Sequence, residues 1–155
     1  MRSGRRLAID VGKVRIGLAI SDFHGILASG LTNVTRAKTL EQTCEAILLA
    51  IKDEDLLEIF VGLPLAMSGA HTASTLDAIE VAKALSELVQ VPVKMIDERL
   101  STVSATANLR ASGRDSKSGR KVIDQIAATV ILEQALQIER QTGQGAGVSL
   151  EDLDD

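Results

Sequence analysis

The sequence predicts an α/β fold with a mixed five-stranded sheet: a three-strand antiparallel meander, then alternating helices and strands, with helices on both faces. Two observations support this prediction. Residues 6–12 and 15–21 are β-rich runs joined by a short polar link, which is the pattern of an antiparallel hairpin. Beyond residue 38, apolar residues at helical spacing alternate with short apolar runs, as they do in α/β proteins.

The other elements follow from local patterns in the sequence. A weaker third strand covers residues 25–34, and apolar residues at positions 40, 44, 47, 48 and 51 predict a helix over 38–53. The apolar run 57–64 is a strand that ends at Gly62 and Pro64. A second helix covers 75–89, with its apolar side at Leu76, Ile79, Ala82 and Leu88. The order ends with a strand over 91–96, a short helix from Ser101 to about Gly113, a loop to residue 121 and a long helix over about 122–141.

The 155 residues suit one domain, which we place at residues 1–141. No apolar run reaches the roughly 18 residues of a membrane span, and Asp10 and Arg15 interrupt any signal-like apolar run near the start. We therefore expect a cytoplasmic protein without membrane contact. Residues 142–155 are rich in Gly and then in acids, which predicts a disordered acidic tail.

Charge is distributed unevenly along the chain. The formal net charge is −4, but the last five residues carry four acids, so the other 150 residues hold 17 acids and 17 bases. Positive charge is concentrated in residues 110–121. This segment contains one acid, Asp115, and five bases: Arg110, Arg114, Lys117, Arg120 and Lys121. Such a segment suits an anionic partner. The absence of Trp and Tyr argues against a platform that stacks single-stranded bases.

One acid stands on the apolar side of the last predicted helix. At about 100° per residue, Ala127, Ala128 and Ile131 lie within about 60° of Asp124. The opposite, solvent side carries Glu133, Gln137 and Arg140. A carboxylate in the first helical turn often complements the helix dipole, but that role does not explain its side of the helix. We therefore expect Asp124 to face the sheet.

Two further groups of acids lie where strands are predicted. Asp10 shares one strand face with the small residues Ala8 and Gly12, which leaves room for a ligand beside it. Residues 97–99, Asp-Glu-Arg, follow a strand at its carboxyl end, the edge where open α/β sheets bind ligands. Taken alone, turn geometry at Asp10 and a local ion pair within 97–99 are the simpler explanations.

Together, these acids indicate a cation site. One carboxylate from a central strand, one from a strand end and one from a helix can converge on a divalent cation, and oxygen ligands favour Mg²⁺ or Mn²⁺ over zinc. His24 and His71 are typical of loops, and Cys44 is typical of a core. A carboxylate-bound metal beside a basic loop suits phosphodiester hydrolysis, in which the cation polarises the phosphate while Arg and Lys hold the backbone.

Four stretches resemble the YqgF/RuvX family in order and in spacing: AIDVGKVRIGLA, VGLPLAMSG, DERLST and GRKVIDQIAATVILE. The likeness runs from Arg6 to about Leu136. Members of this family have a ribonuclease H-like fold and are described as Holliday-junction resolvases and as nucleases that process the 5′ end of 16S ribosomal RNA precursors. The resemblance implies a ribonuclease H-like nuclease domain over residues 1–141.

The resemblance also implies roles for single residues. The catalytic and metal-binding set would be Asp10, Glu98 and Asp124, with Asp97 in reserve if Glu98 instead pairs with Arg99. Contacts to phosphate and nucleic acid would come from Lys13, Arg15, Arg99, Arg120 and Lys121. Residues 62–64 match a family loop that would shape the floor of the cleft.

The expected function is thus metal-dependent processing of the 5′ end of the 16S precursor, with structured RNA or ribosomal precursor particles as partners. A Holliday-junction resolvase for four-way DNA junctions is the first alternative, although it would usually need a symmetric dimer, and the oligomeric state stays open. A nucleotide-binding domain of the actin and sugar-kinase type is disfavoured because those ATPases use two lobes. A non-catalytic scaffold that binds RNA or protein in ribosome maturation is disfavoured because all three acids are present.

Overall fold

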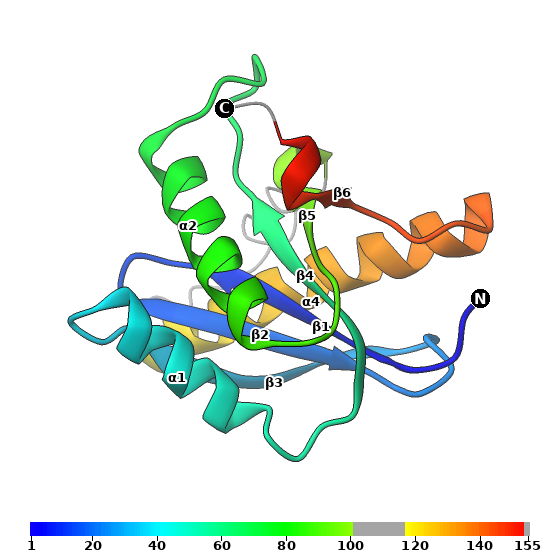
Figure 1. The fold of residues 1–155 in the computed structure, drawn as a ribbon, viewed down its shortest axis with the longest axis horizontal. Coiled ribbons are helices and arrows are strands. Elements are labelled where there is room, and N and C mark those ends of the chain that lie inside the picture. The colour runs from blue at the N-terminus through cyan, green and yellow to red at the C-terminus, as the bar shows by residue number, and fades with distance from the viewer. Residues whose placement is uncertain (101–116, 154–155) are drawn as a thin grey trace.

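The computed structural model describes the backbone of residues 1–100 and 117–153 and the side chains of residues 1–99 and 125–153. Within these residues, six strands form one mixed sheet in the order β3-β2-β1-β4-β5-β6 (Figure 1). The strands are β1 (Arg5–Val11), β2 (Arg15–Ser21), β3 (Ala28–Thr35), β4 (Leu56–Leu63), β5 (Val93–Asp97) and β6 (Val148–Ser149). The helices are α1 (Leu40–Ala50), α2 (Ala73–Leu88) and α4 (Lys117–Thr142), with short 3₁₀ turns η1 (Glu98–Leu100) and η2 (Leu150–Asp152).

The architecture confirms the predicted fold class. Strands β1, β2 and β3 form the antiparallel meander, and β4 and β5 extend it from β1 in parallel register. Helices α1 and α2 cover one face of the sheet, and α4 crosses the other (Figure 1). Among the described helices, none is long and apolar enough to cross a membrane.

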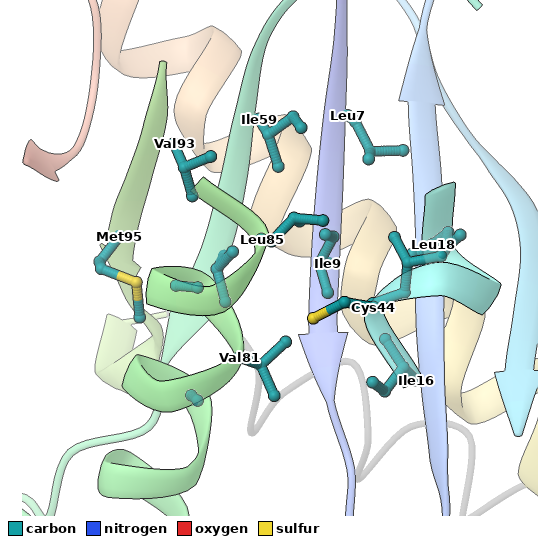
Figure 2. Packing of buried hydrophobic residues seen from close by; sticks show 14 of the residues in the cluster. Leu7, Ile9, Ile16, Leu18, Cys44, Ile59, Val81, Leu85, Val93 and Met95 are labelled. Carbon is teal, nitrogen blue, oxygen red and sulfur yellow. The ribbon is translucent and has the colours of Figure 1, made fainter. Parts of the chain in front are cut away.

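Alternation along β1 divides the interior into two cores. Leu7 and Ile9 pack with Leu18, Cys44 and Val81 on the face that α1 and α2 cover (Figure 2). The other face is covered by α4 and its core is smaller and partly made of alanines: Ala8, Ala19, Phe60, Ala128 and Ile131. The predicted faces of the last helix are confirmed, because Ala127, Ala128 and Ile131 are buried and Glu133, Gln137 and Arg140 are exposed.

Both later helices differ from the sequence prediction. Helix α2 begins earlier, because Thr72 caps it and exchanges hydrogen bonds with Thr75. Its predicted apolar side was wrong at Leu76 and Leu88, which are more than half exposed, while Ala78, Val81 and Leu85 are buried with Ile79 and Ala82. Helix α4 begins at Lys117, so the last part of the predicted basic loop is helical. The short helix predicted from Ser101 to Gly113 lies outside the described residues, and so do Arg110 and Arg114.

The sheet has one more strand than the five predicted, and it comes from the segment predicted to be a disordered tail. Strand β6 pairs antiparallel with β5 through Lys94↔Ser149 and Met95↔Val148. Leu150 and Leu153 then pack against the larger core. Residues 142–155 have the composition of a solvated tail. Their few apolar residues nevertheless pack at the edge of the sheet, beside β5.

A cluster of buried charges joins α4 to the start of β1 and β4. Arg6 is fully buried, and its Nη2 donates to Glu139 Oε2 on α4 at 3.0 Å. Arg2 Nη2 donates to Glu139 Oε1 at 2.6 Å and also to the buried Glu58. Burial alone would raise the pKa of Glu139, but the bonds from Arg2 and the charge of Arg6 outweigh it and lower that pKa to about 2. The cluster fixes the carboxyl half of α4 on the sheet.

Replacing Glu139 with Ala is expected to lower the free energy of unfolding by about 3 kcal/mol, because it leaves the buried Arg6 guanidinium without its counter-charge. The matched change is Glu54→Ala, which removes the partially exposed partner of Arg5 and is expected to cost about 0.5 kcal/mol. Urea unfolding at neutral pH measures both. Equal losses in the two variants would contradict a structural role for the buried cluster.

Candidate functional site

Asp10 lies near the carboxyl end of β1, on the sheet face that α4 covers. It pairs with Gly17 of β2, and Ala8 and Ala19 form the next pair on the same face. These small neighbours leave the half-buried carboxyl group accessible above the sheet. The small-residue surroundings predicted for Asp10 are therefore present.

Glu98 meets Asp10 across the intervening strand. It is the first residue of η1, directly after β5, and β4 separates β5 from β1. Gly62, on the strand between them, leaves room for Glu98, because a Cβ there would lie 2.8 Å from both Cδ and Oε2 of Glu98. The two carboxyl groups are in hydrogen-bonding contact. A glycine in the middle strand thus allows two acids from separate strands to touch.

This contact changes the protonation of Glu98. Burial, the negative charge of Asp10, the hydrogen bond to Asp10 and the charge of Asp97 raise the pKa of Glu98 from 4.5 to about 8. Near neutral pH and without a cation, burial and the neighbouring Asp10 therefore favour the protonated form of Glu98, and the proton is shared within the pair. Oxygen donors in this state bind a hard cation in exchange for the proton.

Arg99 pairs with Asp97 and leaves Glu98 to Asp10. Its Nε and Nη2 donate to Asp97 Oδ2 at 2.9 and 2.6 Å, and Nη1 donates to the carbonyl of Met67 at 3.3 Å. The side-chain bonds from Arg99 lower the pKa of Asp97, which keeps this carboxylate ionised. The condition under which Asp97 would replace Glu98, a Glu98–Arg99 pair, is not met. On α4, Gln134 Nε2 donates to the Asp97 carbonyl at 3.2 Å and supports the start of η1.

The turn between β1 and β2 carries Lys13 and leads into Arg15. Lys13 is exposed, and Arg15 is partly exposed on the same face as Gly17 and Asp10, by strand alternation. Arg36, which follows β3, holds this turn. It donates to the Gly12 carbonyl at 3.3 Å and forms a two-bond ion pair with Asp77 of α2 at 2.5 and 3.1 Å.

The third predicted acid lies on α4. Asp124 precedes the buried Ala128 by one helical turn, and Arg120 and Lys121 precede it on the same helix. The side chains of these three residues are outside what the structure describes. Among the side chains that are described, no group of three His, Cys, Asp or Glu forms a metal site. The structure thus brings together Asp10 and Glu98 of the predicted set.

Two contacts that support the site could not be predicted from the sequence. The Arg36–Asp77 pair joins residues that are 41 positions apart, and the Gln134–Asp97 bond joins residues 37 positions apart. Neither separation leaves a local pattern. The prediction that a strand ends at Gly62 and Pro64 is close, since β4 ends at Leu63, but the place of Gly62 on the strand between the two acids depends on the strand order.

Comparison with known proteins gives the chain a family. A model of the RuvX family, described as Holliday junction resolvase, matches residues 4–138. A protein of Leifsonia xyli subsp. xyli named "Putative pre-16S rRNA nuclease" is 52% identical over 151 residues, which cover 97% of both chains. A protein of the same name from Clavibacter michiganensis subsp. michiganensis is 50% identical over 147 residues, 95% of this chain and 91% of that protein.

Solved structures agree with this fold. RuvC of Thermus thermophilus superposes with a TM-score of 0.54 at 14% identity, over 93% of this chain and 99% of that chain. The same protein in complex with a Holliday junction substrate gives a TM-score of 0.56 at 13% identity. At these identities the likeness concerns the fold, and it confirms the ribonuclease H-like architecture expected from the resemblance.

Adding a side chain at Gly62 is expected to separate the two acids. The Cβ of Gly62→Ala would lie 2.6 Å from Ile131 Cδ1 and 2.8 Å from Glu98 Cδ, so one of them must move, at a cost of about 2 kcal/mol of stability. Where Glu98 moves away from Asp10, carboxyl NMR titration should show a lower pKa for Glu98, because the charge and hydrogen bond of Asp10 are lost while the larger effect of burial remains. Gly30→Ala is the control, because it presses on Gln125 of α4 and not on Glu98. An unchanged Glu98 pKa in Gly62→Ala, together with an unchanged methyl NMR signal of Ile131, would contradict the described contact.

The raised pKa of Glu98 also predicts how stability depends on pH. Between its ordinary pKa of 4.5 and about 8, the folded protein binds more protons at Glu98 than the unfolded chain does. This group therefore makes the metal-free protein progressively less stable as pH rises through that range. Glu98→Gln should remove this part of the slope in urea unfolding with EDTA, and its advantage over wild type should grow with pH. Parallel pH profiles for the two proteins would refute the assignment.

Proposed function

The chain belongs to the RuvX family, and from that premise we propose that it is a divalent-metal-dependent nuclease that processes the 5′ end of the 16S ribosomal RNA precursor. The observation that carries the proposal is the contact of Asp10 with Glu98 over Gly62. The names of its relatives supply the substrate, since proteins about half identical over nearly the whole chain are named for pre-16S rRNA. We propose that the nuclease domain predicted over residues 1–141 also includes the edge strand β6 and the residues that follow it to 153, and that the enzyme acts in the cytoplasm, where such a substrate is found.

The residues fit a hard divalent cation, Mg²⁺ or Mn²⁺. Asp10 and Glu98 bring two carboxyl groups into contact at a cost that is visible in the raised pKa of Glu98, and a cation would relieve that repulsion. We propose that Asp10, Glu98 and Asp124 hold the metal. When bound, it would polarise the phosphate and stabilise charge on the leaving oxygen.

The remaining roles belong to the chain's own side chains. Loss of the Glu98 proton frees its carboxylate for the cation, and Asp10 is positioned for the same task by the small residues beside it. Lys13, Arg15, Arg120 and Lys121 would bind the phosphate backbone on either side of the scissile bond. Arg99 would bind phosphate through the part of its guanidinium that Asp97 and Met67 do not engage, so we assign it a secondary contribution.

A Holliday-junction resolvase is the second candidate, because the description of the family model names that activity. A four-way DNA junction offers the same phosphodiester chemistry as precursor RNA, so the site alone does not separate the two substrates. We favour RNA because of the names of the close relatives.

The decisive experiment compares cleavage of a 5′-extended 16S precursor RNA and of a four-way DNA junction, with Mn²⁺, Mg²⁺ or EDTA. Wild type is expected to cut the RNA with metal only, and Asp10→Asn, Glu98→Gln and Asp124→Asn should each lose at least about a hundredfold in rate. Glu133→Gln, an exposed acid on α4, is the matched control and should cut normally.

Each result has a clear meaning. Preferential cutting of the junction would replace the RNA assignment by the resolvase. Metal-dependent cutting that survives all three substitutions would refute the proposed ligands. Failure of folded wild type to cut either substrate would refute the nuclease and favour a scaffold that binds RNA or protein.

A further inference from the structure

The turn between β2 and β3 presents three large apolar side chains to solvent. Phe23 is 55% exposed, Ile26 66% and Leu27 60%. Single exposed apolar residues are common on protein surfaces, whereas several on one turn mark an interaction site. The chain contains two Phe and no Trp or Tyr, so one of its two aromatic side chains other than His lies exposed on this turn.

Hydrogen bonds hold this turn in one conformation. Asp22 Oδ1 accepts from the backbone N–H groups of Ile26 and Leu27 at 2.7 and 2.9 Å. The Asp22 N–H donates to the Leu27 carbonyl, and Gly25, with a φ of 68°, donates to the Asp22 carbonyl, each at 3.2 Å. The exposed side chains therefore start from an ordered backbone, which lowers the entropy cost of binding a partner.

A negatively charged hollow of about 460 Å³ opens beside Phe23. Its other walls are residues 3–5 and 53–57. Three acids, Asp53, Glu54 and Asp55, and one base, Arg5, line it, which gives a net charge of −2. Arg5 pairs with Glu54 at 3.2 Å. Within the described part of the chain, no ion pair neutralises Asp53 or Asp55.

This turn surface, made of Phe23, Ile26, Leu27, Asp53 and Asp55, is separate from the paired acids. Strand β2 ends at Ser21 beside the start of β1, whereas Asp10 lies near the other end of β1. In Figure 1 the turn lies beside the N-terminus, away from the end of β1 that carries Asp10. The unpaired carboxylates of the hollow would repel phosphate, so RNA does not fit this surface.

We propose that the turn surface docks a basic protein segment that carries apolar side chains. The apolar side chains of that segment pack on Phe23, Ile26 and Leu27, and a Lys or Arg enters the hollow and pairs with Asp53 and Asp55. Proteins that coat RNA are rich in Lys and Arg because they neutralise phosphate. A partner of this chemistry can sit at one end of the sheet while the paired acids at the other end stay free for nucleic acid.

Fluorescence anisotropy with a labelled peptide of about twelve residues, a repeat of Lys-Leu-Arg, tests the proposal. Peptides of the same length with Lys-Ser-Arg or Glu-Leu-Glu repeats are the probes that lack apolar or basic character. Leu27→Ser and the double variant Asp53→Asn, Asp55→Asn should each weaken binding of the Lys-Leu-Arg peptide by about tenfold. The matched controls are Leu49→Ser, on exposed α1 surface, and the double variant Glu45→Gln, Glu133→Gln.

The proposal holds if the Lys-Leu-Arg peptide binds most tightly and only the turn-surface variants weaken it. Equal binding of the three peptides, no measurable binding, or equal losses in the control variants would overturn it. So would an RNA oligonucleotide that shifts the amide NMR signals of residues 22–27. Cleavage of protein-free RNA should be unchanged in all these variants, so the result does not depend on whether the nuclease assignment is correct.

Discussion

The contact between two carboxyl groups across a strand that carries glycine is the constraint on which the site depends. Parallel strands on either side of a third are about 10 Å apart, so their short acidic side chains meet only where the middle strand leaves the space empty. Gly62 leaves that space, and Ile131 of α4 closes it from above. The order β1-β4-β5, the absence of a side chain at residue 62 and the close approach of α4 are therefore parts of one requirement.

The face under α4 uses charge in opposite ways at its two ends. At the start of β1 and β4, the buried charges of Arg6, Glu58 and Glu139 and the partly exposed Arg2 compensate one another. At the other end, the carboxyl groups of Asp10 and Glu98 are in contact, and burial together with the charge of Asp10 raises the pKa of Glu98. Stability from the compensated end, and from the alanine-rich contacts between, can offset the repulsion at the site.

Much of this arrangement could be predicted from the sequence, because its signals were local. Alternation in residues 6–12 and 15–21 predicted the hairpin, and helical periodicity placed Ala128 and Ile131 on the buried side of α4. The approach of Asp10 to Glu98 was expected because one acid was placed on a central strand and the other at a strand end, together with the family motifs. For Asp124, and for the phosphate contacts, the assignment stays a prediction.

What could not be predicted depended on partners far apart in the chain or on small deviations from a pattern. Arg6 and Glu58 lie near the starts of strands, where charged side chains are usually exposed. No local pattern in the sequence indicates that Glu139 is buried. Strand β6 was not predicted because a Gly-rich stretch precedes its two residues and acids follow them, a composition typical of a disordered tail. Leu76 and Leu88 fit a helical stripe as well as the buried residues do, and only the cap at Thr72 and the neighbouring sheet decide which side packs.

The bond from the Arg2 backbone to Glu139 joins residues 137 positions apart, so it closes a loop of almost the whole chain. Such a contact forms late in folding, since the entropy of loop closure is lost before the contact stabilises anything. The buried guanidinium of Arg6 lacks its counter-charge until Glu139 of α4 has docked, whereas Glu58 also pairs with Arg2 and lies 3.8 Å from Lys94. The face under α4 is therefore completed by a contact of very long range in sequence, and contacts of this kind slow folding more than they limit stability.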